Sequence, residues 1–129
     1  MRQTVQQLLA EAKSRIREID ANELRALQAR GVPVVDVREP AEFAAGHLPG
    51  ASHIPRGVLE FEIDGHPAVN CARDPALAHR DQPIVLYCRS GGRSALAAEA
   101  LKRLGFAEPL SLAGGYLGWV EGGGEVEGA

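Results

Sequence analysis

A chain of 129 residues is long enough for one domain with a sizeable hydrophobic core and too short for two packed domains. Apolar residues make up 45% and charged residues 24%, a balance that excludes a disordered, collagen-like or membrane-embedded chain. The net charge of −3 excludes a general attraction to nucleic acid or anionic membranes, so an anionic ligand requires a local site. Because no segment resembles a secretory signal or a membrane span, we expect a cytoplasmic protein without nucleic-acid or membrane partners.

The first part of the chain is predicted to contain two helices. Apolar residues recur at helical spacing and predict a helix over residues 4–15. Residues 16–19 have apolar ends and a polar middle, which fits either a continuation of that helix or a short strand. Asp20 stands three residues before Glu23, the spacing of a capping box, so a second helix is expected over about 21–30.

Strands and helices alternate in the rest of the chain. Runs of β-branched residues predict strands at 33–37 and 83–87, each buried on both faces of a parallel sheet. A long connection with some helix is expected over about 58–82. A helix that Gly105 ends follows the second of these strands, and a further strand is expected at 110–112. This order predicts an α/β domain whose ligand site lies at the carboxyl ends of the strands.

The segment that carries chemistry begins at Cys88, at the end of an apolar strand and before a helix. Both positions favour a thiolate, because free N–H groups and the positive end of the helix dipole surround the sulfur. Arg89 and Arg93 add positive charge nearby. Gly91 and Gly92 can adopt positive φ, so that successive N–H groups turn inward as an anion-binding nest. We predict that Cys88 is a nucleophile with a lowered pKa.

Three other interpretations of this segment are disfavoured. A small buried cysteine beside a structural turn does not explain why the six residues after Cys88 are all charged, polar or glycine. A nucleotide-binding turn is disfavoured because neither common glycine-rich phosphate motif is present. A cysteine phosphatase of the C-x5-R type needs an arginine six residues after the cysteine, where this chain has Ser94. The arginine comes one residue early, at Arg93, and the loop is one residue short for phosphate.

Several segments together resemble the single-domain rhodaneses, which are thiosulfate sulfurtransferases. The similarity runs from about Ile19 to Trp119. It rests on Val35-Asp-Val-Arg-Glu-Pro-Ala-Glu-Phe43, Gly46-His-Leu-Pro-Gly-Ala51, His53-Ile-Pro-Arg-Gly57, Tyr87-Cys-Arg-Ser-Gly-Gly-Arg-Ser94 and Leu112-Ala-Gly-Gly-Tyr-Leu-Gly-Trp119.

The resemblance implies a central five-stranded parallel sheet with helices on both faces. It divides the chain into an N-terminal helical extension (1–18) and a rhodanese-like domain (19–121). The glycine-rich end (122–129) is expected to form a flexible tail. In such a fold, the loop from Cys88 to Arg93 surrounds a persulfide with its amides.

The implied reaction is transfer of sulfane sulfur through a Cys88 persulfide, with kinetics of the ping-pong type. The donor is thiosulfate or a persulfide, the acceptor is cyanide or a thiol, and a sulfur-carrier protein is a further candidate partner. No metal or organic cofactor is required. The alternative is a non-catalytic or sulfur-relay module that acts with a protein partner. The residues expected to contact substrate are Arg89, Ser90, Gly91, Gly92, Arg93 and Arg56.

Charged residues after the first β-branched strand are expected to support the loop, together with Ser94. Glu42 or Asp36 is a candidate partner for an inward-pointing Arg93, and Arg38 lies at the same sheet edge. If the pair with Arg93 is buried, removal of one member costs about 3–5 kcal/mol.

The other candidate metal ligands and nucleophiles lack a supporting pattern. Cys71 is expected to be an inert cysteine rather than a resolving thiol. A metal site is not expected, because the histidines show neither paired spacing nor a cysteine at finger-like spacing. These histidines are His47, His53, His66 and His79.

Overall fold

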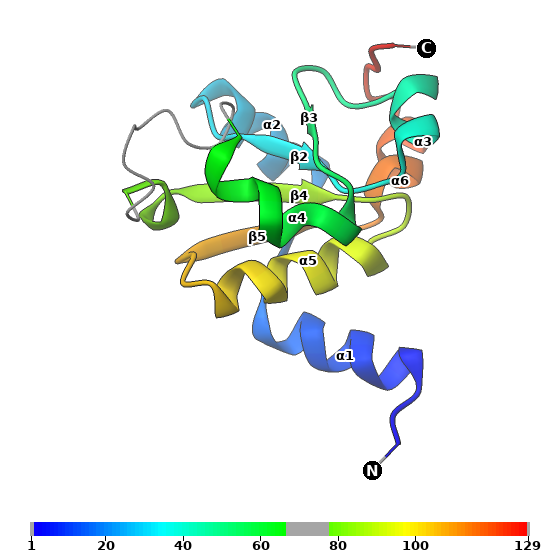
Figure 1. Ribbon diagram of the computed structural model, residues 1–129. Helices are drawn as coiled ribbons and strands as arrows, with labels where there is room; N and C mark the ends of the chain where they lie inside the picture. The colour runs from blue at the N-terminus through cyan, green and yellow to red at the C-terminus, as the bar shows by residue number, and fades with distance from the viewer. Residues whose placement is uncertain (1, 67–77, 129) are drawn as a thin grey trace.

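A single parallel sheet organises the protein, whose computed structural model describes residues 2–66 and 78–128. The strand order is β1-β5-β4-β2-β3, and every neighbouring pair is parallel (Figure 1). The α/β fold with a five-stranded parallel sheet is therefore confirmed. The strands are β1 (Arg17–Ile19), β2 (Val34–Asp36), β3 (Ser52–His53), β4 (Pro83–Tyr87) and β5 (Glu108–Leu112).

Helices connect the strands and cover both faces of the sheet. The α-helices are α1 (Val5–Arg15), α2 (Ala21–Ala29), α3 (Pro40–Ala45), α4 (Leu59–Glu62), α5 (Gly92–Arg103) and α6 (Gly115–Glu121). Shorter 3-10 turns are η1 (Arg56–Val58), η2 (Ile63–Gly65) and η3 (Ala78–Asp81).

The core has two parts, one on each face of the sheet. On one face, Leu59 of α4 and Leu101 of α5 pack against alternate residues of β4 such as Leu86. On the other face, Leu24 of α2 and Trp119 of α6 complete a second cluster. Because the strands are buried on both faces, they read as nearly continuous apolar runs, which explains why the runs at 33–37 and 83–87 were recognisable.

The segment at residues 16–19 forms the edge strand β1 and does not continue α1. Ile19 is buried, and β1 pairs with β5 in the register Ile19↔Leu112. Asp20 then caps α2 through the predicted capping box with Glu23. The short-strand interpretation is therefore confirmed.

The N-terminal helix packs outside α5, away from the sheet (Figure 1). Ala12 is fully buried there, and Arg15 contacts Glu99 of α5 through an ion pair of 3.0 Å. Lys102 of α5 donates a hydrogen bond to the carbonyl of Arg15 at 2.7 Å. The extension is thus held to the domain by both apolar and polar contacts.

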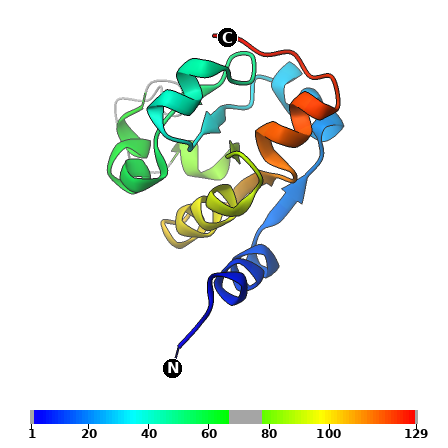
Figure 2. The ribbon, with the colours of Figure 1, turned by 90° about the vertical axis from the view of Figure 1, so that its right-hand side faces the viewer.

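The described C-terminal residues, 122–128, contact two other parts of the domain. The segment crosses α6, where the Trp119 indole N–H donates to the carbonyl of Glu125 at 2.6 Å. It then pairs with His47 through two backbone hydrogen bonds with Glu127, of 2.9 and 2.8 Å. Figure 2 shows this last stretch running across the end of the domain. The flexibility of this tail stays a prediction.

In the part of the chain that the structure describes, no helix has both the length and the apolar character that a membrane span requires.

Candidate active site

The sheet brings Cys88 to the carboxyl ends of its central strands. Cys88 follows β4 directly, and its relative exposure is 1%. The adjacent strand β2 ends beside it, because Asp36 pairs in register with Tyr87. This is the edge at which open parallel sheets hold their ligands.

Hydrogen-bond donors surround the Cys88 sulfur. The N–H of Gly91 donates to Sγ at 3.0 Å, and the hydroxyl oxygen of Ser94 lies 3.5 Å from Sγ. Burial raises the pKa of Cys88, whereas hydrogen bonds from the Ser94 hydroxyl and from the N–H groups of Ser94, Gly91 and Ser90 lower it. The donors prevail, and the pKa of the thiol lies below its usual range. The site therefore favours a thiolate.

The loop after Cys88 depends on a left-handed residue. Gly91 has φ +111°, a conformation that L side chains rarely adopt, and it caps the start of α5. Gly92 begins the helix, while Arg89 and Ser90 are exposed. Of the predicted loop residues, Ser90 and Gly91 thus direct their N–H groups to the sulfur.

A second glycine turn closes the loop from the other side. The N–H groups of Tyr116 and Leu117, at the start of α6, donate to the carbonyls of Cys88 and Arg89 at 2.8 and 3.0 Å. Gly115 precedes them with φ +55°, and a Cβ there would lie 2.6 Å from both of those carbonyl oxygens. Only glycine permits this close approach of α6 to the loop.

Arg93 is directed to Glu42 of α3. Its guanidinium makes two hydrogen bonds to the carboxylate, of 2.8 and 3.1 Å. The hydrogen bond from Arg93, above all, lowers the pKa of Glu42 from its ordinary 4.5 to about 2. The Arg93 side chain is 36% exposed and that of Glu42 is 30% exposed. The pair is therefore not buried, and the cost of about 3–5 kcal/mol expected for loss of one member of a buried pair does not apply. Between Glu42 and Asp36, the two candidate partners, the structure selects Glu42.

Asp36 instead holds Arg38 beneath the site. Both side chains are buried, with exposures of 0% and 4%, and Nη2 of Arg38 lies 2.7 Å from the carboxylate. The Arg38 guanidinium also lies 4.2 Å from the ring centroid of Tyr116. Arg38 therefore contacts Tyr116, whose N–H donates to the Cys88 carbonyl, and a supporting role of Asp36 and Arg38 for the loop stays a prediction.

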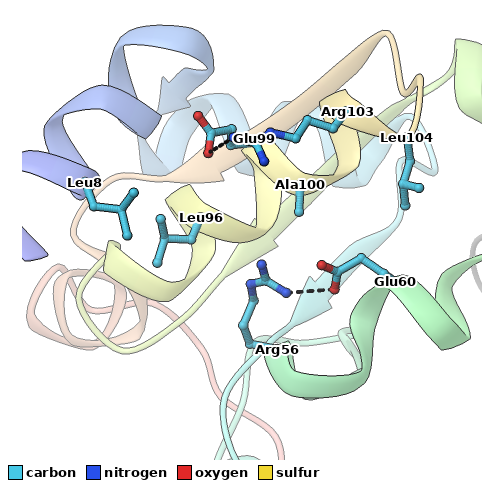
Figure 3. Close-up of a pocket in the computed structure, with 8 residues that line it drawn as sticks. All are labelled: Leu8, Arg56, Glu60, Leu96, Glu99, Ala100, Arg103 and Leu104. Atoms are coloured by element: carbon cyan, nitrogen blue, oxygen red, sulfur yellow. Dashed lines mark hydrogen bonds and ion pairs between the residues drawn. The ribbon is translucent and has the colours of Figure 1, made fainter. Parts of the chain in front are cut away.

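The Arg56 side chain contacts Glu60 of α4. Its guanidinium pairs with Glu60 at 2.8 Å and lines a groove of about 450 Å³ along α5 (Figure 3). Leu96 and Ala100 of α5 line the same groove. A substrate-binding role for Arg56 stays a prediction, and none of these contacts supports it.

A separate pocket of about 360 Å³ adjoins the loop. Arg89 lines it together with Arg38, Glu42, Tyr116 and Leu117. Arg38 is paired with Asp36, and Glu42 with Arg93, so Arg89 is the lining cation that has no ion pair among the residues that the structure describes.

Sequence reasoning did not assign a role to Gly115 or Ser111. Gly114-Gly115 after a predicted strand was the available signal for a tight approach. The signal for Ser111 was a lone hydroxyl between Leu110 and Leu112 in the expected strand at 110–112, and its oxygen lies 2.8 Å from that of Ser94.

Within the described ranges, no cluster of three metal-ligating side chains occurs. His47 and His53 both stack on the ring of Phe43, with centroid distances of 3.8 and 4.7 Å. Cys71 lies outside the described residues.

The chain is similar to proteins of one family over most of its length. The family model for the rhodanese-like domain matches residues 20–122. A sulfurtransferase from Allochromatium vinosum is 33% identical over 110 residues, which cover 84% of this chain and 92% of that protein. The thiosulfate sulfurtransferase GlpE from Pseudomonas entomophila is 34% identical over 106 residues, covering 82% and 86%.

Solved structures are also similar to this chain. The human single-domain sulfurtransferase TSTD1 has a TM-score of 0.68 and 33% identity, with coverage of 81% of this chain and 95% of that chain. A protein of unknown function from Rhodopseudomonas palustris, described as a possible tyrosine phosphatase, has a TM-score of 0.81 and 33% identity. Its coverage is 98% and 96%, so the similarity includes the N-terminal helix.

The two glycines of α6 offer a matched test of the loop closure. Gly115→Ala adds a methyl group against the carbonyls of Cys88 and Arg89 and requires a left-handed alanine, which alone costs about 1–2 kcal/mol. We expect a lower melting temperature and reduced alkylation of Cys88. Gly118→Ala meets no atom within 4 Å and should melt at or above the wild-type temperature. Equal melting temperatures of the two variants would contradict the closure of the Cys88 loop by α6.

The Arg93–Glu42 pair predicts a stability difference that depends on pH. A carboxylate whose folded pKa is lowered contributes stability above its ordinary value of 4.5, and loses it as the pH falls toward about 2. Arg93→Ala should therefore melt below wild type at about pH 7, by an amount equivalent to about 1 kcal/mol for a partly exposed pair. The gap should narrow below about pH 4.5. Arg89→Ala is the control and should show a wild-type melting profile. If the difference in melting temperature between Arg93→Ala and wild type does not change with pH, the assignment of Glu42 as the partner of Arg93 is refuted.

Proposed function

The chain belongs to the rhodanese-like family, and from this membership we propose that it is a sulfurtransferase that carries sulfane sulfur on Cys88. Relatives named sulfurtransferase share about a third of its residues over most of both chains. The observation that carries the proposal is the Cys88 sulfur itself, buried at the sheet edge with donors on several sides. Such a setting supports an anionic sulfur as both nucleophile and leaving group.

In the first half-reaction, the Cys88 thiolate attacks the outer sulfur of thiosulfate. The sulfur–sulfur bond of thiosulfate breaks, sulfite leaves with the bonding electron pair, and a Cys88 persulfide remains. Thiosulfate is our choice of donor because a relative carries it in its name and because the doubly charged ion suits the exposed Arg89 beside the nucleophile.

In the second half-reaction, cyanide or a thiolate attacks the terminal sulfur of the persulfide. The bond between that sulfur and Sγ breaks, and its electron pair returns to Sγ as the thiolate. Charge and atoms balance in both steps without a metal or an organic cofactor. A persulfide donor or a sulfur-carrier protein can enter the same cycle, since each step requires only access to Cys88.

Arg89 is the residue that we assign to the donor's sulfonate. It is exposed, follows the nucleophile directly and borders the pocket beside the loop with Arg38. Arg93, by contrast, is held by Glu42 and shapes the loop. The amides of Ser90, Gly91 and Gly92 complete the anion cradle.

Replacement of the nucleophile provides the principal test. Cys88→Ser should abolish thiosulfate:cyanide sulfurtransferase activity while the melting temperature stays close to wild type, because serine keeps the shape but not the thiolate. Cys71→Ser should be nearly neutral. Wild-type protein incubated with thiosulfate should gain the mass of one sulfur atom in a native mass spectrum, and Cys88→Ser should not. Comparable losses of activity in both variants would overturn the assignment of Cys88 as the sole nucleophile.

A relay or binding module makes a different prediction in the same experiment. Such a module would take sulfur from a protein-bound persulfide but would show neither the mass gain nor turnover with thiosulfate. A panel of donors that includes thiosulfate, a low-molecular-weight persulfide and a protein-bound persulfide therefore separates the two functions.

Phosphatase activity should be weak or absent, although one structural relative is described as a possible tyrosine phosphatase. The loop from Cys88 to Arg93 is one residue shorter than the C-x5-R loop that encircles phosphate. Insertion of one glycine after Gly92 moves the arginine to that position and should raise hydrolysis of an aryl phosphate while sulfur transfer falls. A wild-type rate on aryl phosphates that equals the rate on thiosulfate would refute the size argument.

A further inference from the structure

A buried serine of the last strand lies behind the candidate nucleophile. Ser111 of β5 has a relative exposure of 0%. Its neighbours Leu110 and Leu112 belong to the apolar cluster beneath α2 and α6. Because side chains alternate along a strand, Ser111 faces the opposite side of the sheet, where α5 packs. A hydroxyl at such a buried position requires a hydrogen-bond partner.

That partner is Ser94, which connects Ser111 to the sulfur. The two hydroxyl oxygens lie 2.8 Å apart, and the Ser94 oxygen lies 3.5 Å from Sγ of Cys88. Ser94 is itself fully buried in the first turn of α5. Side chains from β5, from α5 and from the end of β4 thus form one continuous chain of contacts.

The chemistry of the thiolate and the hydroxyl group sets which group donates and which accepts in this series of hydrogen bonds. A thiolate can only accept hydrogen bonds, so it gains from Ser94 only when the single Ser94 proton points at Sγ. Ser94 must then be the acceptor toward Ser111. Without Ser111, the Ser94 hydroxyl is free to turn to a backbone carbonyl of the preceding turn, as serines in helices commonly do.

We propose that Ser111 is a positioning residue, which donates to Ser94 and thereby holds the Ser94 hydroxyl as a donor to the Cys88 thiolate. Its effect on sulfur transfer rests on the proposed function, whereas its effect on the resting thiol does not. In the second half-reaction, the electron pair of the broken sulfur–sulfur bond moves onto Sγ, and a better-stabilised thiolate leaves faster.

The first test measures Cys88 in the resting protein, without sulfur transfer. The chain has two cysteines, so a Cys71→Ser background leaves Cys88 as the only thiol. The rate of alkylation by iodoacetamide is then followed against pH. Ser111→Ala should move the midpoint of this profile to higher pH and slow alkylation on its rising limb by roughly threefold to tenfold. An unmoved profile would overturn the proposal, even if the protein transfers sulfur.

A double-mutant cycle tests whether Ser111 acts through Ser94. Ser94→Ala should move the midpoint at least as far as Ser111→Ala, and the double variant should move it no further than Ser94→Ala. Additive shifts would refute a connected chain. Ser52→Ala, in β3 at the other edge of the sheet, is the control and should leave the profile unchanged.

An isosteric pair guards against a purely structural effect. Ser111→Thr and Ser111→Val have the same shape, but only threonine keeps the hydroxyl. Threonine should therefore retain a midpoint near wild type, and valine should shift it as alanine does. If the two profiles coincide, the hydroxyl has no positioning role. If the wild-type protein does not transfer sulfur from thiosulfate to cyanide, the proposed function is refuted, and the alkylation result still stands.

Discussion

Stabilisation of a negative sulfur that is cut off from water is the requirement on which the site depends. Burial of Cys88 disfavours its thiolate, and the protein replaces the lost water with the Gly91 N–H and the Ser94 hydroxyl. These donors are effective only at fixed positions, because hydrogen bonds weaken steeply with poor geometry. The surrounding fold therefore has to fix a short loop that contains two glycines.

Two supports from distant parts of the chain fix that loop. On one side, the first N–H groups of α6 hold the carbonyls of Cys88 and Arg89, an approach that Gly115 makes possible. On the other side, Glu42 of α3 binds Arg93 through both of its oxygens. The parallel sheet brings these supports together, since β2, β4 and β5 all end at the same edge.

The sequence predicted those parts of the structure that have a local signature. The apolar runs of β2 and β4, the capping box of α2 and the Cys88 loop follow from residues close together in the chain. Between Asp36 and Glu42 it left the partner of Arg93 open, because the choice depends on how α3 packs against the loop. Ser111 was unassigned because its partner lies 17 positions away on another element.

The C-terminal pairing has a practical consequence for anyone who handles this protein. Glu127 pairs with the backbone of His47, just after the helix that carries Glu42, and the tail covers Trp119 on its way there. A tag or fusion partner joined directly at this end would pull on a segment that pairs with the chain just after α3. The N-terminus, which projects beyond α1 on the far side of α5, is the better place for an affinity handle or a surface linkage (Figure 1).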